Sequence, residues 1–279
     1  MNYGVTLTGV GPMADPDKLR RLACKADQLG FHSLWLYEHV AFPAKIPESY
    51  GKISFTPETP FLDPVATLAY LAADTKQIRL GIGVLLVVLR HPLMASKLVS
   101  TLDVISGGRV ILGVGLGWLA EEYEAQGIPF KERAGRLQES VEILRKIWVT
   151  GKLQYQGRYY QFPESTSYPL PLQRGGPPIW FGATVESALK RAAELGDGWL
   201  GIPGPPETIE KQLSQVIEFA RQARKKDFIV AMGATPEITA EEVAHLRQMG
   251  VNHINLTFTA GEAAEIEARM ESAVRRLAV

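Results

Sequence analysis

Cysteine is almost absent from this 279-residue chain, which contains a single one, Cys24. One thiol can form no internal disulfide and no cysteine cluster for a metal, so we expect a protein of a reducing compartment, the cytoplasm. Net charge is lacking as well, because 30 Lys and Arg residues balance 30 Asp and Glu residues. Without a dominant basic surface, no nucleic-acid partner is expected.

Long apolar runs are also missing. The longest, residues 80–89, lies between Arg79 and Arg90 and has about half the length that a membrane-spanning helix requires. The first residues, MNYGVTLTG, contain no basic segment of the kind that opens an export signal. The histidines show no H-E-x-x-H spacing, and no G-x-S-x-G elbow occurs. We therefore expect a soluble protein that stays in the cytoplasm and binds no membrane. The absence of both motifs also argues against a hydrolase.

Short apolar runs that alternate with longer helical patterns dominate what is present. With 46% hydrophobic residues, the chain can bury the large core of an α/β domain. Eight strands alternate with eight major helices, and no linker-like segment interrupts them. This pattern predicts one (β/α)8 TIM barrel over residues 1–279, with a doubly wound sheet as the alternative. The strands are expected at residues 3–8, 31–36, 79–86, 110–114, 179–181, 197–202, 228–232 and 253–258.

Capping signals mark where the helices begin. Asp15-Pro16 and Asp63-Pro64 each combine an N-cap carboxylate with a proline at the first helical position. Two further helices are expected to begin at capping boxes, Thr239-x-x-Glu242 and Thr259-x-x-Glu262.

Two insertions interrupt the barrel pattern, one after the second strand and one after the fourth. The first contains four aromatic residues and four prolines within about twenty residues, which favours a functional lid over a structureless loop. The second, residues 152–162, alternates around Gly157 like a small hairpin. We expect both insertions to lie at the same end of the barrel as the ligand site. The aromatic residues of the first are Phe42, Tyr50, Phe55 and Phe61.

The stretch RVILGVGLGWLAEEYEAQG, residues 109–127, predicts a strand, a glycine loop and a helix. Gly115 and Gly117 remove Cβ atoms where the backbone turns, so that a phosphate could approach its N–H groups; the alternative is a tight turn without a ligand. Trp118 stands where a dinucleotide fingerprint needs its third glycine, which excludes NAD-type binding. Glu121, Glu122 and Glu124 are interpreted as solvated side chains near the positive end of the helix dipole.

Two other strand ends show similar small residues. Gly182-Ala183-Thr184 repeats the phosphate-compatible design, although Thr184 could equally serve only as an N-cap. Glycines inside the third strand indicate a bulge or a backbone that passes close to a ligand, with Gly83-Val84 as the position of interest.

Barrel polarity selects one histidine among five. Catalytic groups of TIM barrels lie at the carboxyl ends of the strands, whereas His32 and His253 fall at strand starts and His245 within a helix. His91 precedes Pro92 and could simply shape that loop. His39 follows Glu38 directly after the second strand, so it is the candidate acid or base, with a purely structural histidine as the alternative.

These segments together resemble the bacterial luciferase-like superfamily and, within it, oxidoreductases that depend on the deazaflavin coenzyme F420. The resemblance covers nearly the whole chain. It is carried by ADQLGFHSLWLYEH (26–39), TPFLDPVATLAYLAADTKQIRLGIGVLLVVLRHP (59–92), LDVISGGRVILGVGLGWLAEEYEAQGIPFKERAGRLQE (102–139) and PPIWFGATVESALKRAAELGDGW (177–199).

The resemblance implies a deazaflavin or flavin held over the strand ends. It implies cofactor contacts at Gly115, Gly117 and Trp118 and again at Gly182 and Ala183, with Thr184 beside them. It also implies a non-proline cis peptide at Gly83-Val84. The family's aspartate before the histidine is replaced here by Glu38, for which we expect a role in orienting or charging His39.

We therefore expect hydride transfer between F420 and a small organic substrate, with His39 and Glu38 as catalytic residues. The alternative is an FMN-dependent monooxygenase, since phosphate loops do not distinguish the two cofactors. A third possibility is a barrel that binds a flavin-like ligand without turnover or has unrelated chemistry. No cationic clamp for a phosphorylated substrate can be mapped, so the substrate stays open. A homodimer is expected from the resemblance and from the apolar helices at residues 63–75 and 92–106.

Overall fold

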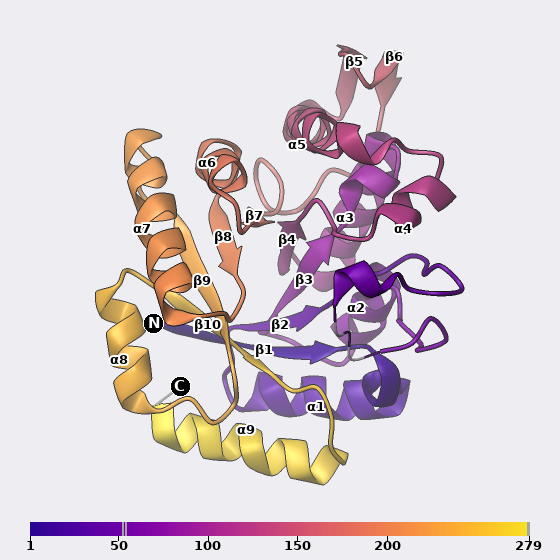
Figure 1. Ribbon diagram of the computed structural model, residues 1–279. Helices are drawn as coiled ribbons and strands as arrows, with labels where there is room; N and C mark the ends of the chain where they lie inside the picture. Colours follow the sequence, from indigo (N-terminus) through magenta and orange to yellow (C-terminus); the bar gives the residue numbers. More distant parts are fainter. Residues whose placement is uncertain (52, 54, 278–279) are drawn as a thin grey trace.

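A closed barrel of eight parallel strands forms the centre of the computed structural model, which describes residues 1–51, 53 and 55–277. Helices surround the barrel (Figure 1), so the predicted (β/α)8 fold is confirmed. Around the ring the order is β1-β10-β9-β8-β7-β4-β3-β2. The strands are β1 (Asn2–Thr8), β2 (Ser33–Leu36), β3 (Arg79–Leu85), β4 (Val110–Val114), β7 (Ile179–Gly182), β8 (Gly198–Gly201), β9 (Ile229–Ala234) and β10 (His253–Thr257).

The first and last strands close the ring. β1 pairs with β10 in parallel from Asn2 opposite His253 to Thr6 opposite Thr257, and its other edge pairs with β2. In this order β10 lies across the ring from β4, and β1 lies across from β7. Residues at the carboxyl ends of these two pairs of strands therefore face each other across the barrel mouth.

The outer helices begin where the capping signals predicted, with one exception. Asp15 and Asp63 accept hydrogen bonds from the N–H groups of Lys18 and Ala66, and Thr239 forms the complete capping box with Glu242. The helices are α1 (Pro16–Gln28), α2 (Pro64–Ala72), α3 (Pro92–Ser106), α4 (Ala120–Ala125), α5 (Arg133–Thr150), α6 (Glu186–Leu195), α7 (Pro206–Gln222), α8 (Ala240–Gln248) and α9 (Ala263–Leu277).

The capping box expected at Thr259 is wrong. α9 begins only at Ala263, and its first turn is closed by the N–H of Ile266 donating to the carbonyl of Glu262. Thr259 lies in the loop before the helix, too early to reach the first-turn N–H groups. Sequence spacing alone could not distinguish the two starts, because a Thr-x-x-Glu pattern also occurs in loops.

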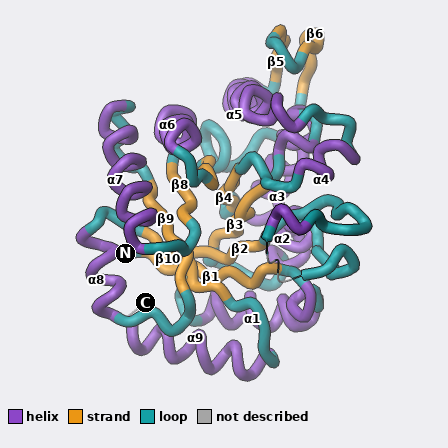
Figure 2. Tube along the Cα trace, viewed as in Figure 1, coloured by secondary structure: helices purple, strands orange, loops and turns teal. Residues whose placement is uncertain are grey.

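The two long segments differ in where they lie. The segment between β2 and α2 is tied to the loop after β1, because Gly11 N–H donates to Pro60 and Leu62 N–H donates to Gly9. The antiparallel hairpin β5 (Lys152–Gln156) and β6 (Gln161–Thr166) projects beyond α5 (Figure 2). Ile143 of α5 packs against three aromatic residues of the hairpin, Tyr155, Tyr160 and Phe162, in an apolar cluster that is separate from the main core.

The barrel interior is filled below the mouth by large side chains. Trp35, Ile111, Trp180 and Ala231 form a buried cluster inside the ring, as expected for a barrel whose centre is a packed core and not a pore. Within the described residues, 1–51, 53 and 55–277, no helix is long and apolar enough to cross a membrane.

Candidate active site

A cavity of about 500 Å³ opens at the carboxyl ends of the strands. Each of the eight strands, or the loop directly after it, contributes lining residues, which is where TIM barrels hold their ligands. All eight residues predicted to contact a cofactor lie around this one cavity. They are Gly83, Val84, Gly115, Gly117, Trp118, Gly182, Ala183 and Thr184.

Gly115, directly after β4, and Gly182, the last residue of β7, make room for Val84. A Cβ atom at Gly115 would lie 2.5 Å from Cγ2 of Val84, and one at Gly182 would lie 3.0 Å from its Cγ1. The peptide bond between Gly83 and Val84 is cis, as the resemblance implied. We call Gly83, Val84, Gly115, Gly117 and Gly182 the glycine wall of the cavity.

Two features that favour a bound anion border the glycine wall, an arginine and a helix N-terminus. Arg133, the first residue of α5, is the one charged side chain among the residues that line the cavity in the described part of the chain. Its guanidinium lies 3.7 Å from the centre of the Phe130 ring, and its Nε is buried without a hydrogen-bond partner among the described residues. Arg133 is not among the residues predicted from the sequence, because the prediction considered only α4, the helix that directly follows the glycine loop. The sequence signal for it was an arginine at the start of α5, the helix after that.

The second feature is the N-terminus of α6. Thr184, Val185 and Ala188 line the cavity beside it. The N-cap residue is Val185, whose side chain cannot accept a hydrogen bond, so the interpretation of Thr184 as the N-cap is wrong. An uncapped helix start leaves N–H groups and the positive end of the dipole available to an anion. Together with Arg133, it fits a phosphate-bearing cofactor.

His39 lies beside the cavity and not in its lining. Its ring contacts Trp118, which does line the cavity, at 5.5 Å between ring centres, and it is surrounded by Phe42, Phe55 and Phe61. Its side chain is 11% exposed. The aromatic residues of the first insertion thus pack around the imidazole and cover it, which accords with the predicted lid.

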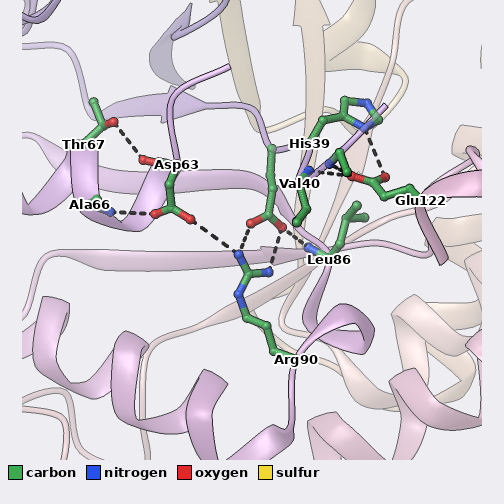
Figure 3. Close-up of polar contacts among 10 residues, drawn as sticks. His39, Val40, Asp63, Ala66, Thr67, Leu86, Arg90 and Glu122 are labelled. Atoms are coloured by element: carbon green, nitrogen blue, oxygen red, sulfur yellow. Dashed lines mark hydrogen bonds and ion pairs between the residues drawn. The ribbon is translucent and has the colours of Figure 1, made fainter. Parts of the chain in front are cut away.

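Glu122 is the acidic partner of His39, and the interpretation of this residue as solvated is wrong. It is 1% exposed, and its Oε2 lies 3.2 Å from His39 Nδ1 (Figure 3). Its Oε1 accepts hydrogen bonds from the N–H groups of Val40 and Ala41 at 2.5 and 3.3 Å. Because a carboxylate only accepts, Nδ1 of His39 carries the hydrogen of this contact, and Nε2 is left for another partner.

Glu121 is also engaged, because its Oε2 accepts a hydrogen bond from the Tyr50 hydroxyl at 2.9 Å. The same hydroxyl accepts from the N–H of Ala120 at 3.1 Å. Two adjacent glutamates of α4 therefore fasten the first insertion to the helix after the glycine loop. The sequence alone could not show this, since acidic residues at a helix start are usually explained by the dipole.

The carboxylate of Glu38 forms no hydrogen bond or ion pair with His39 in the described structure, contrary to the expectation that it orients or charges the imidazole directly. Glu38 is 6% exposed and is not among the cavity-lining residues; it pairs with Arg90 and accepts a hydrogen bond from Leu86 N–H at 2.6 Å. Burial raises the pKa of its carboxyl, and the Arg90 guanidinium opposes that shift. The pair joins the end of β2 to the segment after β3, and Asp63 at the start of α2 approaches the same arginine at 3.5 Å.

The other histidines lie where barrel polarity predicted. His91 caps α3 by accepting from Leu93 N–H and packs on the hairpin rings of Tyr160 and Phe162. His253 is fully buried inside the ring, where burial lowers its pKa to about 3. In the described part of the chain, no cluster of acidic, histidine and cysteine side chains could hold a metal ion.

The hairpin of the second insertion packs on α5 outside the cavity. No residue from β5 or β6 lines it in the described structure. The apolar cluster on α5 accounts for this, because it holds the hairpin rings against the outer helix instead.

The family model of luciferase-like monooxygenases matches residues 2–276, so the chain belongs to this family of oxidoreductases. An uncharacterized protein of Mycobacterium tuberculosis is 30% identical over 284 residues, covering 100% of this chain and 99% of its own. An F420-dependent glucose-6-phosphate dehydrogenase of Amycolatopsis mediterranei is 28% identical over 75% of this chain and 61% of its own. The oxygenase component of a flavin-dependent trigonelline monooxygenase of Acinetobacter baylyi is 32% identical over 64% and 46%.

Among solved structures, the monooxygenase RslO1 of Streptomyces bottropensis superposes with a TM-score of 0.83. It is 26% identical and covers 100% of this chain and 99% of its own. The similar proteins thus include both F420-dependent and flavin-dependent enzymes.

Proposed function

We propose that this protein transfers a hydride between coenzyme F420 and a small organic substrate in the cytoplasm. One observation carries the proposal: the glycine wall, Arg133 and the uncapped start of α6 border a single cavity at the barrel mouth. A phosphate-bearing cofactor fits there, since a buried guanidinium nitrogen without a partner and free helix N–H groups both favour an anion. Bound F420 would supply the hydride chemistry.

The chain's own residues supply binding, orientation and a proton. Glu122 holds the Nδ1 hydrogen of His39, which leaves Nε2 to accept or deliver a proton on the side away from the carboxylate. The surrounding rings of Phe42, Phe55 and Phe61 exclude water from the imidazole. Glu122 is proposed as a positioning residue and Glu38, through Arg90, as a structural one.

Titration of the purified protein with F420 and with FMN tests the cofactor. We expect F420 to bind at least tenfold more tightly than FMN, measured by cofactor fluorescence. Arg133→Gln should weaken binding roughly tenfold, the scale for losing one charge-assisted hydrogen bond. Arg136→Gln, one turn further along α5 and paired with Glu132, is the matched control and should bind as wild type. Tight FMN binding with no F420 binding would overturn the proposal.

An FMN-dependent monooxygenase is the second candidate, supported by the similarity to the flavin-dependent trigonelline monooxygenase component. The two differ in their reaction with oxygen, which reduced FMN undergoes and the deazaflavin does not. Oxygen consumption by the protein with reduced FMN and substrate, measured with an oxygen electrode, would favour this candidate.

We also propose a homodimer formed through α2 and α3. These helices pack on each other and leave large apolar side chains exposed: Tyr70, Met94, Val104 and Ile105. Ile105→Lys should shift the protein toward monomer in sedimentation velocity at micromolar concentration. Val149→Lys, at an exposed valine of α5, is the matched control. A wild-type protein that sediments as a monomer would contradict the dimer.

A further inference from the structure

The cavity has a second wall that differs in chemistry from the glycine wall. Thr6 of β1, Asn255 and Thr257 of β10, and Tyr37 after β2 line it; we call these four residues the β10 wall. β10 lies across the ring from β4, so the two walls face each other. Every side chain of the β10 wall is polar and uncharged at neutral pH.

Asn255 supplies the one side-chain amide among the four residues of the β10 wall, and neighbouring groups hold it in place. It is 7% exposed, and its Oδ1 lies 2.8 Å from Nε2 of His253. Ser33 Oγ, which accepts from the indole N–H of Trp35, lies 3.2 Å from the same nitrogen. A Cβ atom at Gly4 would lie 2.3 Å from Oδ1 and 2.5 Å from the serine oxygen, so glycine is required on β1 for this arrangement.

The hydrogen of His253 can be assigned from its surroundings. The ring is neutral, because burial lowers its pKa to about 3. A hydrogen on Nδ1 would be a buried donor without a partner among the described residues, whereas a hydrogen on Nε2 meets the amide oxygen of Asn255. Nε2–H of His253 therefore donates to Oδ1, and the amide NH₂ of Asn255 is left as a donor on the cavity side.

We propose that the β10 wall selects an uncharged substrate with a carbonyl or hydroxyl oxygen, and that the amide NH₂ of Asn255 holds this oxygen. A charged substrate group would be desolvated here without a counter-ion, since Arg133 is on the facing side of the cavity with the glycine wall. The inference rests on the proposed function in one respect, that the ligand bound here is the substrate. The ligand preference of the β10 wall can be measured without any cofactor.

The test uses cyclohexanone and 2-decalone as neutral ketones, methylenecyclohexane as an isosteric hydrocarbon and 4-oxocyclohexanecarboxylate as the charged counterpart. Binding is followed by tryptophan fluorescence, since Trp35 and Trp118 line the cavity. The Arg133→Gln background prevents the anion from binding to the guanidinium. We expect at least one ketone to bind at least tenfold more tightly than the carboxylate.

Asn255→Leu should weaken ketone binding about fivefold to tenfold, the scale of one hydrogen bond, and leave methylenecyclohexane unchanged. Asn255→Asp keeps an acceptor for His253 but loses the donor, so it should show the same loss. Asn2→Leu, an exposed asparagine at the start of β1, is the matched control, and circular dichroism verifies that each variant is folded. The proposal is overturned if no ketone binds the folded protein, if the carboxylate binds more tightly, or if both Asn255 variants bind ketone as wild type. If wild-type protein does not bind F420 in the titration described under Proposed function, the proposed function is refuted, but the measured ligand preference of the β10 wall is unaffected.

Discussion

The His39→Ala variant is expected to turn over substrate roughly a hundredfold more slowly than wild type, the usual effect of removing one acid or base. Its affinity for cofactor should change no more than a few-fold, because His39 lies behind Trp118 and does not line the cavity. Steady-state kcat and a cofactor titration check the two parts. Measuring kcat and cofactor affinity separately distinguishes the two roles of His39. If the imidazole only fills the aromatic cluster, its removal should lower stability and leave turnover nearly unchanged.

Two further variants give this prediction its controls. Glu122→Gln should lower kcat less than His39→Ala, since the amide oxygen can still accept from His39 Nδ1 but forms a weaker hydrogen bond than the carboxylate. His91→Ala, which alters the cap of α3 away from the cavity, should keep wild-type kcat. A stable His39→Ala enzyme with near wild-type turnover would show that His39 is structural, and a stable variant unable to bind cofactor would reassign it to binding.

The Gly115→Ala variant is expected to lose roughly tenfold to a hundredfold in cofactor affinity. The new Cβ would lie 2.5 Å from Cγ2 of Val84, a side chain branched at Cβ that cannot bend away. Forcing one extra methyl into such a contact costs about 1 to 3 kcal/mol, and Val84 can yield only by moving within the cavity lining. Fluorescence titration with F420 measures the change.

A second substitution tests whether Val84 is the cause. The double variant Gly115→Ala, Val84→Ala removes the methyl that the new Cβ meets, so its affinity should return to within a few-fold of the Val84→Ala single variant. Gly204→Ala is the matched control, because this glycine has no positive φ and no neighbour within 4 Å of an added Cβ. If the double variant binds no better than Gly115→Ala, Gly115 acts through its backbone and not by making room for Val84.

The sequence predicted the barrel because its strand and helix patterns are local. Strand periodicity, Asp-Pro caps and the glycines after β4 and β7 each depend on a few neighbouring residues, and parallel topology then brings their carboxyl ends together. That is why all eight residues expected around a cofactor line one cavity.

Pairings between distant side chains were not predictable in the same way. His39 could have been oriented by its neighbour Glu38, and only the fold shows that Glu122, 83 residues further along, contacts it instead. Glu38 is taken up by Arg90, 52 residues away. Asn255 and Gly4 gave no signal at all, because a polar residue in one strand and a glycine in another acquire meaning only when β1 and β10 are paired.

The closure of the ring by its first and last strands has a consequence for the order in which the cavity is assembled. Every lining residue of the glycine wall and of the α5 and α6 termini has been synthesised by residue 188, whereas Asn255 and Thr257 are added only with β10. Until then β1 and β9 are both open edges that lack a partner strand. A nascent or partly unfolded chain without β10 therefore retains the residues that fit a phosphate and lacks Asn255 and Thr257, two of the four residues of the facing β10 wall. Selectivity for a substrate is then the last property the chain acquires and the first it loses when this strand detaches.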